Sequence, residues 1–288
     1  MSASGDKFIV AWRSAASSGS EGVTTFDQQD KILYRIYDRS GWSEQTYTLY
    51  DGSSTAGAVK GLQIAMAQDG TAAVAYTLDT AGANSESTEG WETLVAIIPP
   101  DGSEDGIRTV RLTDDNALDE NPQITCGYLD GGERFVVGWH TQRTDAASGN
   151  VEDDIRLAAL NKDGSLYNGM PSSVSTITAG TDLTIGSNFR FAKNATSHAM
   201  YIKDLCILWV DHMAPEDGGK AESLEDAYSE VGYDVLKAVK FIDVDGNLAL
   251  SSAMTVADMR GGGEDAQNSM IDHFDAWASD DTVHSILS

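Results

Sequence analysis

The sequence contains few cysteines and no hydrophobic run long enough to cross a membrane. Its 288 residues include two cysteines, Cys126 and Cys206, and each stands in an apolar run of strand length. A membrane helix needs about 20 consecutive apolar residues, and the longest runs here, such as TLVAII and DLCILWV, are far shorter. No CxxC pair or Cys/His cluster points to zinc. We therefore expect both cysteines to be buried and reduced, with stability coming from an apolar core rather than from cross-links.

Basic residues are also scarce. The chain has 19 Lys and Arg against 45 Asp and Glu, which gives a formal net charge of −26. Such a surface repels the phosphates of nucleic acids and anionic lipids, so neither nucleic acid nor a membrane is expected as a partner. The surplus of carboxylates fits plain solubility, cation binding or a neutral ligand such as a sugar.

Signatures of common enzymes are missing as well. The sequence has no GxSxG, HExxH or Walker motif and no GxGxxG ahead of a helix. It also lacks the Ser-x-Asp-x-Gly-x-Thr-Trp turns of sialidase-type glycosidases, and its arginines are few and scattered. A glycosidase with paired carboxylates stays open as an alternative, because acids are abundant and the distance between two carboxylates is invisible in a sequence.

The sequence does contain an internal repeat. An apolar run that ends in an aromatic residue recurs at intervals of roughly 65 residues, at Trp12, Tyr76, Trp139 and Trp209. A strand-like run precedes each copy, and a polar loop and a second pair of runs follow it. Asp-Gly pairs close many of the turns, and they are typical of hairpins because Gly accepts a positive φ. Each repeat therefore predicts four antiparallel strands, A to D, with the aromatic residue in the core at strand B.

Four-stranded antiparallel units in series predict an all-β fold of the β-propeller type. The chain reads as a single propeller domain, 1–288, and the first blade begins in a B strand. The predicted blades span approximately residues 6–52, 60–113, 121–178 and 187–256, with a partial blade at 268–288. The chain is then either part of a larger ring or a ring of five short blades. The segment 220–231 has the apolar spacing of a short helix inside a loop.

The long connections mark the end of the units where a ligand would bind. In an antiparallel unit the B–C and D–A connections leave from one end, and the A–B and C–D turns leave from the other. The B–C loops are long and acidic, and long loops on a rigid scaffold usually carry binding sites. Histidines beside acids suit metal or acid–base chemistry, and Trp91 suits stacking on a sugar ring. The candidate ligand-binding residues are His140, Asp145, Asp153, Asp211, His212 and Trp91.

The acidic loop at 211–233 suggests a calcium site. Ca²⁺ prefers six to eight oxygen ligands, and the candidate ligands in this loop are Asp217, Glu225 and Asp226. The stretch DVDGN at 243–247 resembles the start of an EF-hand loop, but it lacks the later acidic ligand and fits a hairpin turn.

An acidic residue opens every C strand. Either this residue fixes the entry of the B–C loop by hydrogen bonds to its backbone, or it faces a ligand. Its presence in every unit favours the structural role, since a single ligand site rarely needs every blade. The four residues are Asp30, Glu92, Asp154 and Asp234.

The pattern AVAYT followed by DIRLAALNKDG resembles the divergent β-propeller modules of large secreted or cell-surface bacterial proteins. The resemblance covers the whole chain at the level of the pattern, and it carries over no catalytic residue. It implies an extracellular or cell-surface module of a larger chain, although the start MSASGDKFIVAW shows no secretory signal. We predict a non-catalytic binding or adhesion module that recognises a glycan or a protein through its acidic loops, with Ca²⁺ as a candidate cofactor. The alternatives are a glycoside hydrolase or lyase with a carboxylate site on that face, and a purely structural module.

Overall fold

The computed structural model describes most of the chain. The described residues are 2–15, 30–52, 57–80, 90–115, 117–144, 151–177, 183–192, 201–213, 233–245, 247–259, 271, 274–279 and 282–287. These residues form antiparallel sheets and two short 3₁₀ turns, η1 (Glu104–Gly106) and η2 (Ile202–Asp204), with no α-helix among them. The predicted all-β class is therefore confirmed. Within this part of the chain no helix is long and apolar enough to span a membrane.

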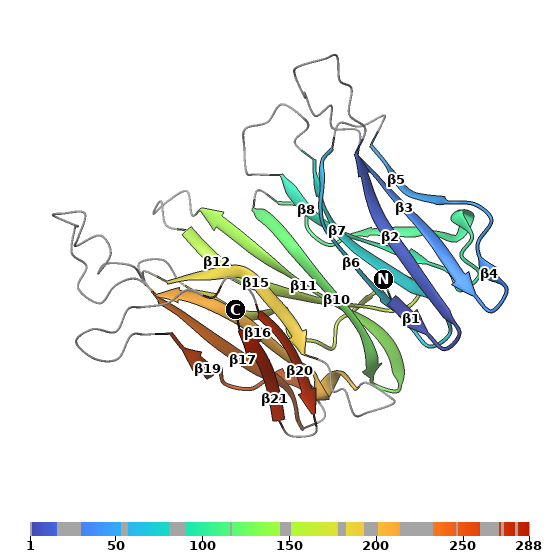
Figure 1. Ribbon diagram of the computed structural model, residues 1–288. Helices are drawn as coiled ribbons and strands as arrows, with labels where there is room; N and C mark the ends of the chain where they lie inside the picture. The colour runs from blue at the N-terminus through green and yellow to red at the C-terminus, as the bar shows by residue number, and fades with distance from the viewer. Residues whose placement is uncertain are drawn as a thin grey trace, which may run out of the picture. The chain divides into compact units, whose positions relative to one another are not determined.

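The chain divides into two compact units. The first contains residues 1–143 and 155–172, and the second contains residues 144–154 and 173–288. Figure 1 shows the strands of both. Within each of the two units the main strands follow the predicted A-to-D order, and A pairs with B, B with C, and C with D. The predicted four-stranded antiparallel repeat is thus observed, and the arrangement of these repeats in a ring stays a prediction.

The first sheet contains a strand that was not expected. A short strand at its very start pairs antiparallel with the first B strand, through Ser2 opposite Ile9 and Ser4 opposite Lys7. The prediction that the first blade begins in a B strand, without an A strand, was wrong. The sequence did not reveal this A strand because only three residues form it and they carry no apolar alternation. The strands of the sheet are β1 (Ser2–Ser4), β2 (Lys7–Ala15), β3 (Asp30–Asp38), β4 (Gly41–Trp42) and β5 (Tyr47–Asp51).

Two further four-stranded sets belong largely to the first unit and are joined by a single parallel bridge between Trp91 and Leu118. The earlier set contains β6 (Val59–Met66), β7 (Ala72–Asp79), β8 (Trp91–Ile98) and β9 (Arg108–Arg111). The later set contains β10 (Leu118–Leu129), β11 (Gly132–Thr144), β12 (Val151–Leu160) and β13 (Leu166–Tyr167), and β14 (Ser173–Ile177) follows along the chain.

The second unit repeats the same order. Its larger sheet contains β15 (Leu183–Ala192), β16 (Cys206–Met213), β17 (Tyr233–Val244), β18 (Asn247–Leu250) and β19 (Met254–Asp258). A separate hairpin follows, made of β20 (Phe274–Ser279) and β21 (Thr282–Leu287). This hairpin corresponds to the predicted A–B pair of the partial blade. The predicted helix at 220–231 lies outside the described residues.

Apolar side chains hold successive sheets of the first unit together. Antiparallel pairing sets Tyr76 opposite Leu94, so both side chains lie on one face of their sheet. That face packs on Ile32 and Tyr34 of the first sheet, and the opposite face, which carries Val95, packs on the third set. The sheet of β6 to β9 is therefore buried on both faces, between the first sheet and the third set of strands.

The aromatic residue of the repeat is a core residue in most copies. Tyr76, Trp139 and Trp209 are buried, as predicted, whereas Trp12 is only partly buried. Both cysteines are free; Cys206 is buried and Cys126 partly so. Burial raises the pKa of the Cys206 thiol, which suits the expected inert core residue.

The first strand of three sets carries an irregularity at a similar place. The register shifts between Lys60 and Gln63 in β6 and between Glu120 and Gln123 in β10, and again in β15. Gly61 in the first of these bulges has φ +59°. A side chain there would come within 2.5 Å of Pro122 Cδ in the bulge of β10. The bulges thus let the first strands of neighbouring sheets approach closely.

Candidate functional site

The acidic residues that open the C strands are buried. Asp30, Glu92, Asp154 and Asp234 all belong to the buried polar residues of the structure. Asp30 Oδ2 accepts a hydrogen bond from the Val59 backbone N–H at 2.8 Å, and Oδ1 lies 3.1 Å from Nε of Arg13. The carboxylate therefore fixes the first strand of the next sheet. This contact lies at the D–A connection, whereas the sequence favoured the B–C loop.

The same arrangement recurs in the second unit. Asp234 Oδ2 accepts a hydrogen bond from the Ile271 N–H at 2.6 Å, which leads into the β20–β21 hairpin. Glu92 instead forms an ion pair with Arg111, with 3.1 Å between Oε1 and Nη2. A buried carboxylate needs such partners to remain charged. These contacts assign Asp30, Glu92 and Asp234 to the fold.

The B–C and D–A connections leave from one end of the sheets, which we call the loop end. The A–B and C–D connections leave from the other, the turn end; most of these are short, although the connection from Ala192 to Cys206 is long. At the loop end of the first unit, four strands each contribute one side chain to a cluster. Nζ of Lys60 (β6) lies 3.8 Å from the centre of the Trp91 ring (β8). Oε1 of Glu120 (β10) lies 3.6 Å from Nδ1 of His140 (β11). We call Lys60, Trp91, Glu120 and His140 the loop-end cluster.

Electrostatics connect the two pairs of this cluster. The contact with His140 is the main cause that lowers the pKa of the Glu120 carboxyl; burial opposes it, and the charge of Lys60 lowers the pKa further. Lys60 is exposed, Trp91 and Glu120 are partly buried, and His140 is buried. The cluster thus presents a cation, a carboxylate and an aromatic ring, with an imidazole behind them.

A second group of polar contacts lies on the opposite face of β10, because Asp119 and Glu120 are consecutive residues of one strand. Trp139 Nε1 donates a hydrogen bond to Asp119 Oδ1 at 3.1 Å. Burial raises the pKa of Asp119, hydrogen bonds from Thr141 and Thr113 offset part of this rise, and nearby carboxylates add to it. Asp119 is 1% exposed, so it is out of reach of a ligand.

The structure thus brings two of the sequence-predicted residues, Trp91 and His140, into one cluster. Asp153 is buried in β12. Asp211 is also buried; it accepts a hydrogen bond from Trp209 Nε1 at 2.7 Å and pairs with Lys237. His212 lies in β16 with its backbone opposite Asp234.

Asp145 and the candidate calcium ligands Asp217, Glu225 and Asp226 lie outside the described residues. Among the residues that the structure does describe, no group of three or more His, Cys, Asp or Glu is arranged to hold a metal ion.

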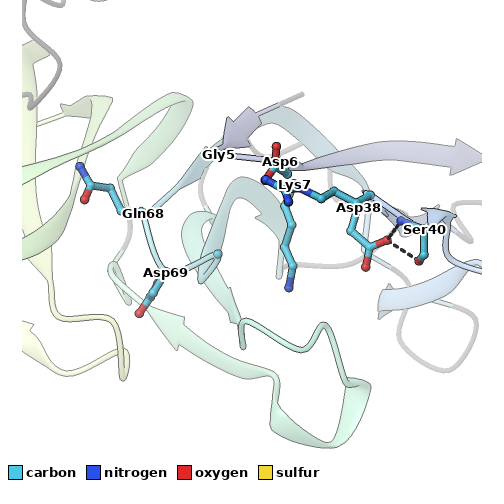
Figure 2. A pocket seen from close by; sticks show the side chains of 9 residues that line it. Gly5, Asp6, Lys7, Asp38, Ser40, Gln68 and Asp69 are labelled. Atoms are coloured by element: carbon cyan, nitrogen blue, oxygen red, sulfur yellow. Dashed lines mark hydrogen bonds and ion pairs between the residues drawn. The ribbon is translucent and has the colours of Figure 1, made fainter.

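A pocket of about 500 Å³ opens at the turn end of the first unit (Figure 2). Three tight turns surround it: β1–β2, β3–β4 and β6–β7. Its lining residues are Gly5, Asp6, Lys7, Asp38, Arg39, Ser40, Gln68, Asp69 and Gly70. The sequence did not single out these residues, because its search for a site followed loop length and the tight turns are short.

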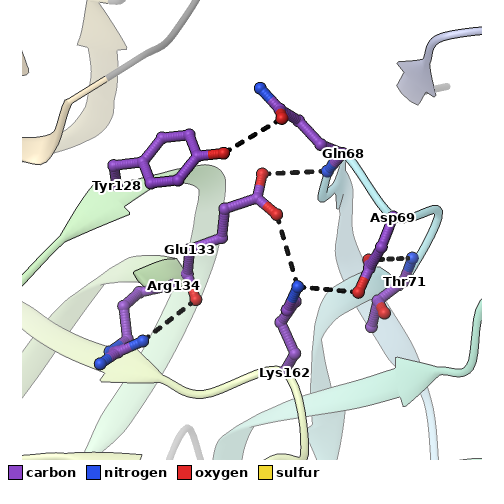
Figure 3. Close-up of polar contacts among 7 residues, drawn as sticks. All are labelled: Gln68, Asp69, Thr71, Tyr128, Glu133, Arg134 and Lys162. Atoms are coloured by element: carbon purple, nitrogen blue, oxygen red, sulfur yellow. Dashed lines mark hydrogen bonds and ion pairs between the residues drawn. The ribbon is translucent and has the colours of Figure 1, made fainter. Parts of the chain in front are cut away.

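A network of polar contacts fixes one wall of this pocket (Figure 3). Glu133 accepts a hydrogen bond from the Gln68 N–H at 2.9 Å, and Tyr128 donates one to Gln68 Oε1 at 3.0 Å. Lys162 Nζ lies 2.7 Å from Asp69 Oδ2 and 3.5 Å from Glu133 Oε2. Since these partners come from β10, β11 and the β12–β13 turn, the wall is held by the neighbouring set of strands.

The tight turns share a local motif that is visible in the sequence. An Asp carboxylate accepts a hydrogen bond from the backbone N–H two residues further on, at Asp38, Asp69, Asp101 and Asp163. At Asp38, Asp101 and Asp163 the same carboxylate oxygen also accepts a hydrogen bond from a Ser hydroxyl. These bonds stabilise the turn and are typical of Asp in this position.

Comparison of the sequence with models of known protein families gave no match, and comparison with curated proteins gave none either. The functional argument therefore rests on the residues themselves.

Proposed function

We propose that the chain is a non-catalytic, extracellular binding or adhesion module whose four-stranded units are the blades of a β-propeller. It recognises a glycan or a protein ligand at the loop end. Two features support the propeller: the repeated A-to-D strand order, and the face-to-face packing of successive sheets in the first unit. The blades belong to a larger secreted or cell-surface protein.

The loop-end cluster carries the proposal of a binding site. Trp91 offers ring surface with the Lys60 ammonium over it. Glu120, which is paired with His140 and feels the charge of Lys60, offers an acceptor. Binding sites combine such apolar surface with a few placed polar groups. The strands that supply the four side chains also contribute residues to the buried core of the first unit, so the groups are held in position before a ligand arrives.

Binding is favoured over catalysis by the surroundings of the carboxyl groups. A glycosidase needs two carboxyl groups that reach the substrate on either side of the scissile bond. Here Glu92 and Asp119 are 2% and 1% exposed, and both are engaged by neighbouring side chains. They suit the interior of the fold better than a substrate cleft.

A glycan array, paired with a hydrolysis and lyase screen on the same glycans, tests this function. We expect saturable binding without turnover, and at least about tenfold weaker binding by Trp91→Ala, the size of loss typical of an anchoring aromatic residue. Trp42→Ala is the matched control, because Trp42 is exposed and lies at the turn end. Turnover would favour the hydrolase or lyase, and the absence of any ligand would favour a structural module.

Calcium is the proposed cofactor of the acidic loops. A ligand that binds only the folded state raises its stability. We therefore expect millimolar Ca²⁺ to raise the melting temperature, and Mg²⁺ at equal ionic strength to have a smaller effect, because Mg²⁺ sheds its water reluctantly. Equal melting curves with both ions would contradict a calcium site.

A further inference from the structure

The turn-end pocket has the size and the polar groups of a binding site in its own right. Its volume of about 500 Å³ lies within the range of small-molecule pockets. It is lined by three carboxylates, two cations, an amide and a hydroxyl, and none of its lining side chains is aromatic. Recognition here would depend on hydrogen bonds rather than on ring stacking.

Asp38 supplies a fixed acceptor. Its Oδ1 accepts bonds from the backbone N–H and the hydroxyl of Ser40, and the Gly41 backbone adds a further bond. These hydrogen bonds are the main reason why the pKa of Asp38 is lowered. A carboxylate has about four lone-pair positions, so at least one remains for a ligand, and the turn holds it in a set direction.

Lys7 supplies a fixed donor beside this acceptor. Its Nζ donates a hydrogen bond to the Pro100 carbonyl at 2.9 Å, and an ammonium has three hydrogens, so two remain. Lys7 and Asp38 line the same pocket, and the charge of Lys7 contributes to the lowered pKa of Asp38. Figure 2 shows both side chains at the same pocket.

The opposite wall is equally well positioned. The Tyr128 hydroxyl donates a hydrogen bond to Oε1 of Gln68, so the two hydrogens of the Gln68 amide remain available to a ligand. Asp69 is held by the Thr71 N–H and by Lys162. Because both walls are fixed by partners of their own, a ligand would lose little free energy in ordering the site.

We propose that this pocket is a second binding site, separate from the loop-end cluster, and that it takes one ring of a neutral polyhydroxylated ligand such as a hexose. A carboxylate acceptor and an ammonium donor that line one pocket match two hydroxyl groups of one ring, since each hydroxyl can both donate and accept. The charged lining residues comprise Asp6, Asp38 and Asp69 against Lys7 and Arg39. This small negative surplus, within a chain of net charge −26, favours a neutral ligand over an anionic one.

Titration of the full chain with glucose, galactose and mannose tests the proposal, with the amide signals of the protein followed by NMR. We expect saturable shifts at Ser40 and Gly70 with at least one of the three sugars. Asp38→Asn, which places an amide donor at the acceptor, should weaken binding at least tenfold, and so should Lys7→Met, which removes the ammonium but keeps the stem. Asp163→Asn is the matched control, because Asp163 makes the same turn with Ser165 and does not line this pocket.

The outcomes separate this site from the loop-end site. Binding that survives Trp91→Ala but is lost in Asp38→Asn supports the pocket, whatever the glycan array shows. No saturable shift with any of the three sugars overturns the proposal, as does equal affinity of wild type, Asp38→Asn and Lys7→Met. The wild-type shifts locate the site without a variant, so a misfolded variant would not obscure the result.

Discussion

Asp30 links one sheet to the next through a single buried carboxylate. Replacing it with Ala would leave the buried N–H of Val59 without its acceptor. An unsatisfied buried donor costs roughly 1–3 kcal/mol, so we expect Asp30→Ala to lower the free energy of unfolding by about 2 kcal/mol. Urea denaturation measures the change. Glu44→Ala removes the same charge from an exposed position of the same sheet, and it should cost less than about 0.5 kcal/mol. Equal effects of the two variants would contradict the role of Asp30.

The Asp turns give a prediction for pH. Hydrogen bonds from the side chain and backbone of Ser165 lower the pKa of Asp163. Ser165→Ala removes the hydroxyl donor but keeps the N–H, so the pKa of Asp163 should rise part of the way to its ordinary value. An NMR titration of the Asp carboxyl carbons measures it, and Asp38, bound by its own Ser40, serves as the internal reference. An unchanged Asp163 pKa would contradict the hydrogen-bond account.

The sign of the linked stability follows from the direction of this shift. A carboxyl group whose pKa is lower in the folded state stabilises the fold above its unfolded pKa, which is about 3.9 for Asp. That contribution is lost as the pH falls through the folded pKa. Ser165→Ala should therefore weaken the pH dependence of the free energy of unfolding in the acid range below about pH 4. Near neutrality the slope of that free energy against pH should change little.

At the scale of single residues the sequence identified several groups but few of their partners. Alternation and recurrence were enough to expect Asp30, Glu92 and Asp234 to be structural, and to place Trp139 and Trp209 in the core. The partner of Asp30 is the N–H of Val59, in the next repeat, and a pattern within one repeat cannot show such a contact. The pairing of Lys60 with Trp91 likewise depends on which strands become neighbours.

Gly61 sits where the first strands of two sheets approach each other. Ala at this position would adopt an unfavourable positive φ and would also meet Pro122. Strain and overpacking each cost roughly 1–3 kcal/mol, so we expect Gly61→Ala to destabilise the protein by about 3 kcal/mol. Gly131→Ala is the control, because Gly131 has φ +73° with open space around it, and strain alone should cost it about 1 kcal/mol. Urea denaturation compares the two, and equal losses would mean that the contact with Pro122 is unimportant.

Whole strands were predicted more reliably than their ends and irregularities. Apolar runs and Asp-Gly turns located the B, C and D strands, because each signal is local. The sequence did not predict β1, because Ser2–Ser4 has no apolar pattern. The pairing of β1 with β2 follows from the turn at Gly5, which has φ +57°. The bulges in β6 and β10 were not predicted from the sequence, because their cause is the close packing of one sheet against another.

The acidic surface gives a prediction for the whole molecule. A net charge of −26 produces self-repulsion that destabilises the compact state. Raising NaCl from about 0.01 to about 0.5 M shortens the screening length from roughly 30 Å to below 8 Å, so the melting temperature should rise. KCl should produce the same rise, because screening does not depend on the identity of the cation. A melting temperature that stays constant or falls would contradict net repulsion, and a rise with one salt alone would indicate specific binding.

The all-β class followed from the repeat, since four strand-like runs per repeat leave no room for another fold class. How the units are arranged depends on which face of each sheet meets which neighbour. Continuous apolar runs such as TLVAII indicate strands buried on both faces. They do not show which sheet covers each face, so the propeller stays a proposal. The turn-end pocket depends on three turns from two sheets coming together, and no single repeat contains that information.

The division of each sheet into tight turns at one end and long connections at the other also sets an order of events when the chain folds. β6 and β7 are joined by the short turn Ala67–Thr71, and closing so short a loop restricts few residues. Hairpins of this kind form within about 1–10 μs, whereas the β7–β8 pair must first close a longer loop. We expect the A–B hairpins with tight turns to form first and to pair with their C strands later. The acidic connections at the loop end would then determine how fast each unit completes its sheet.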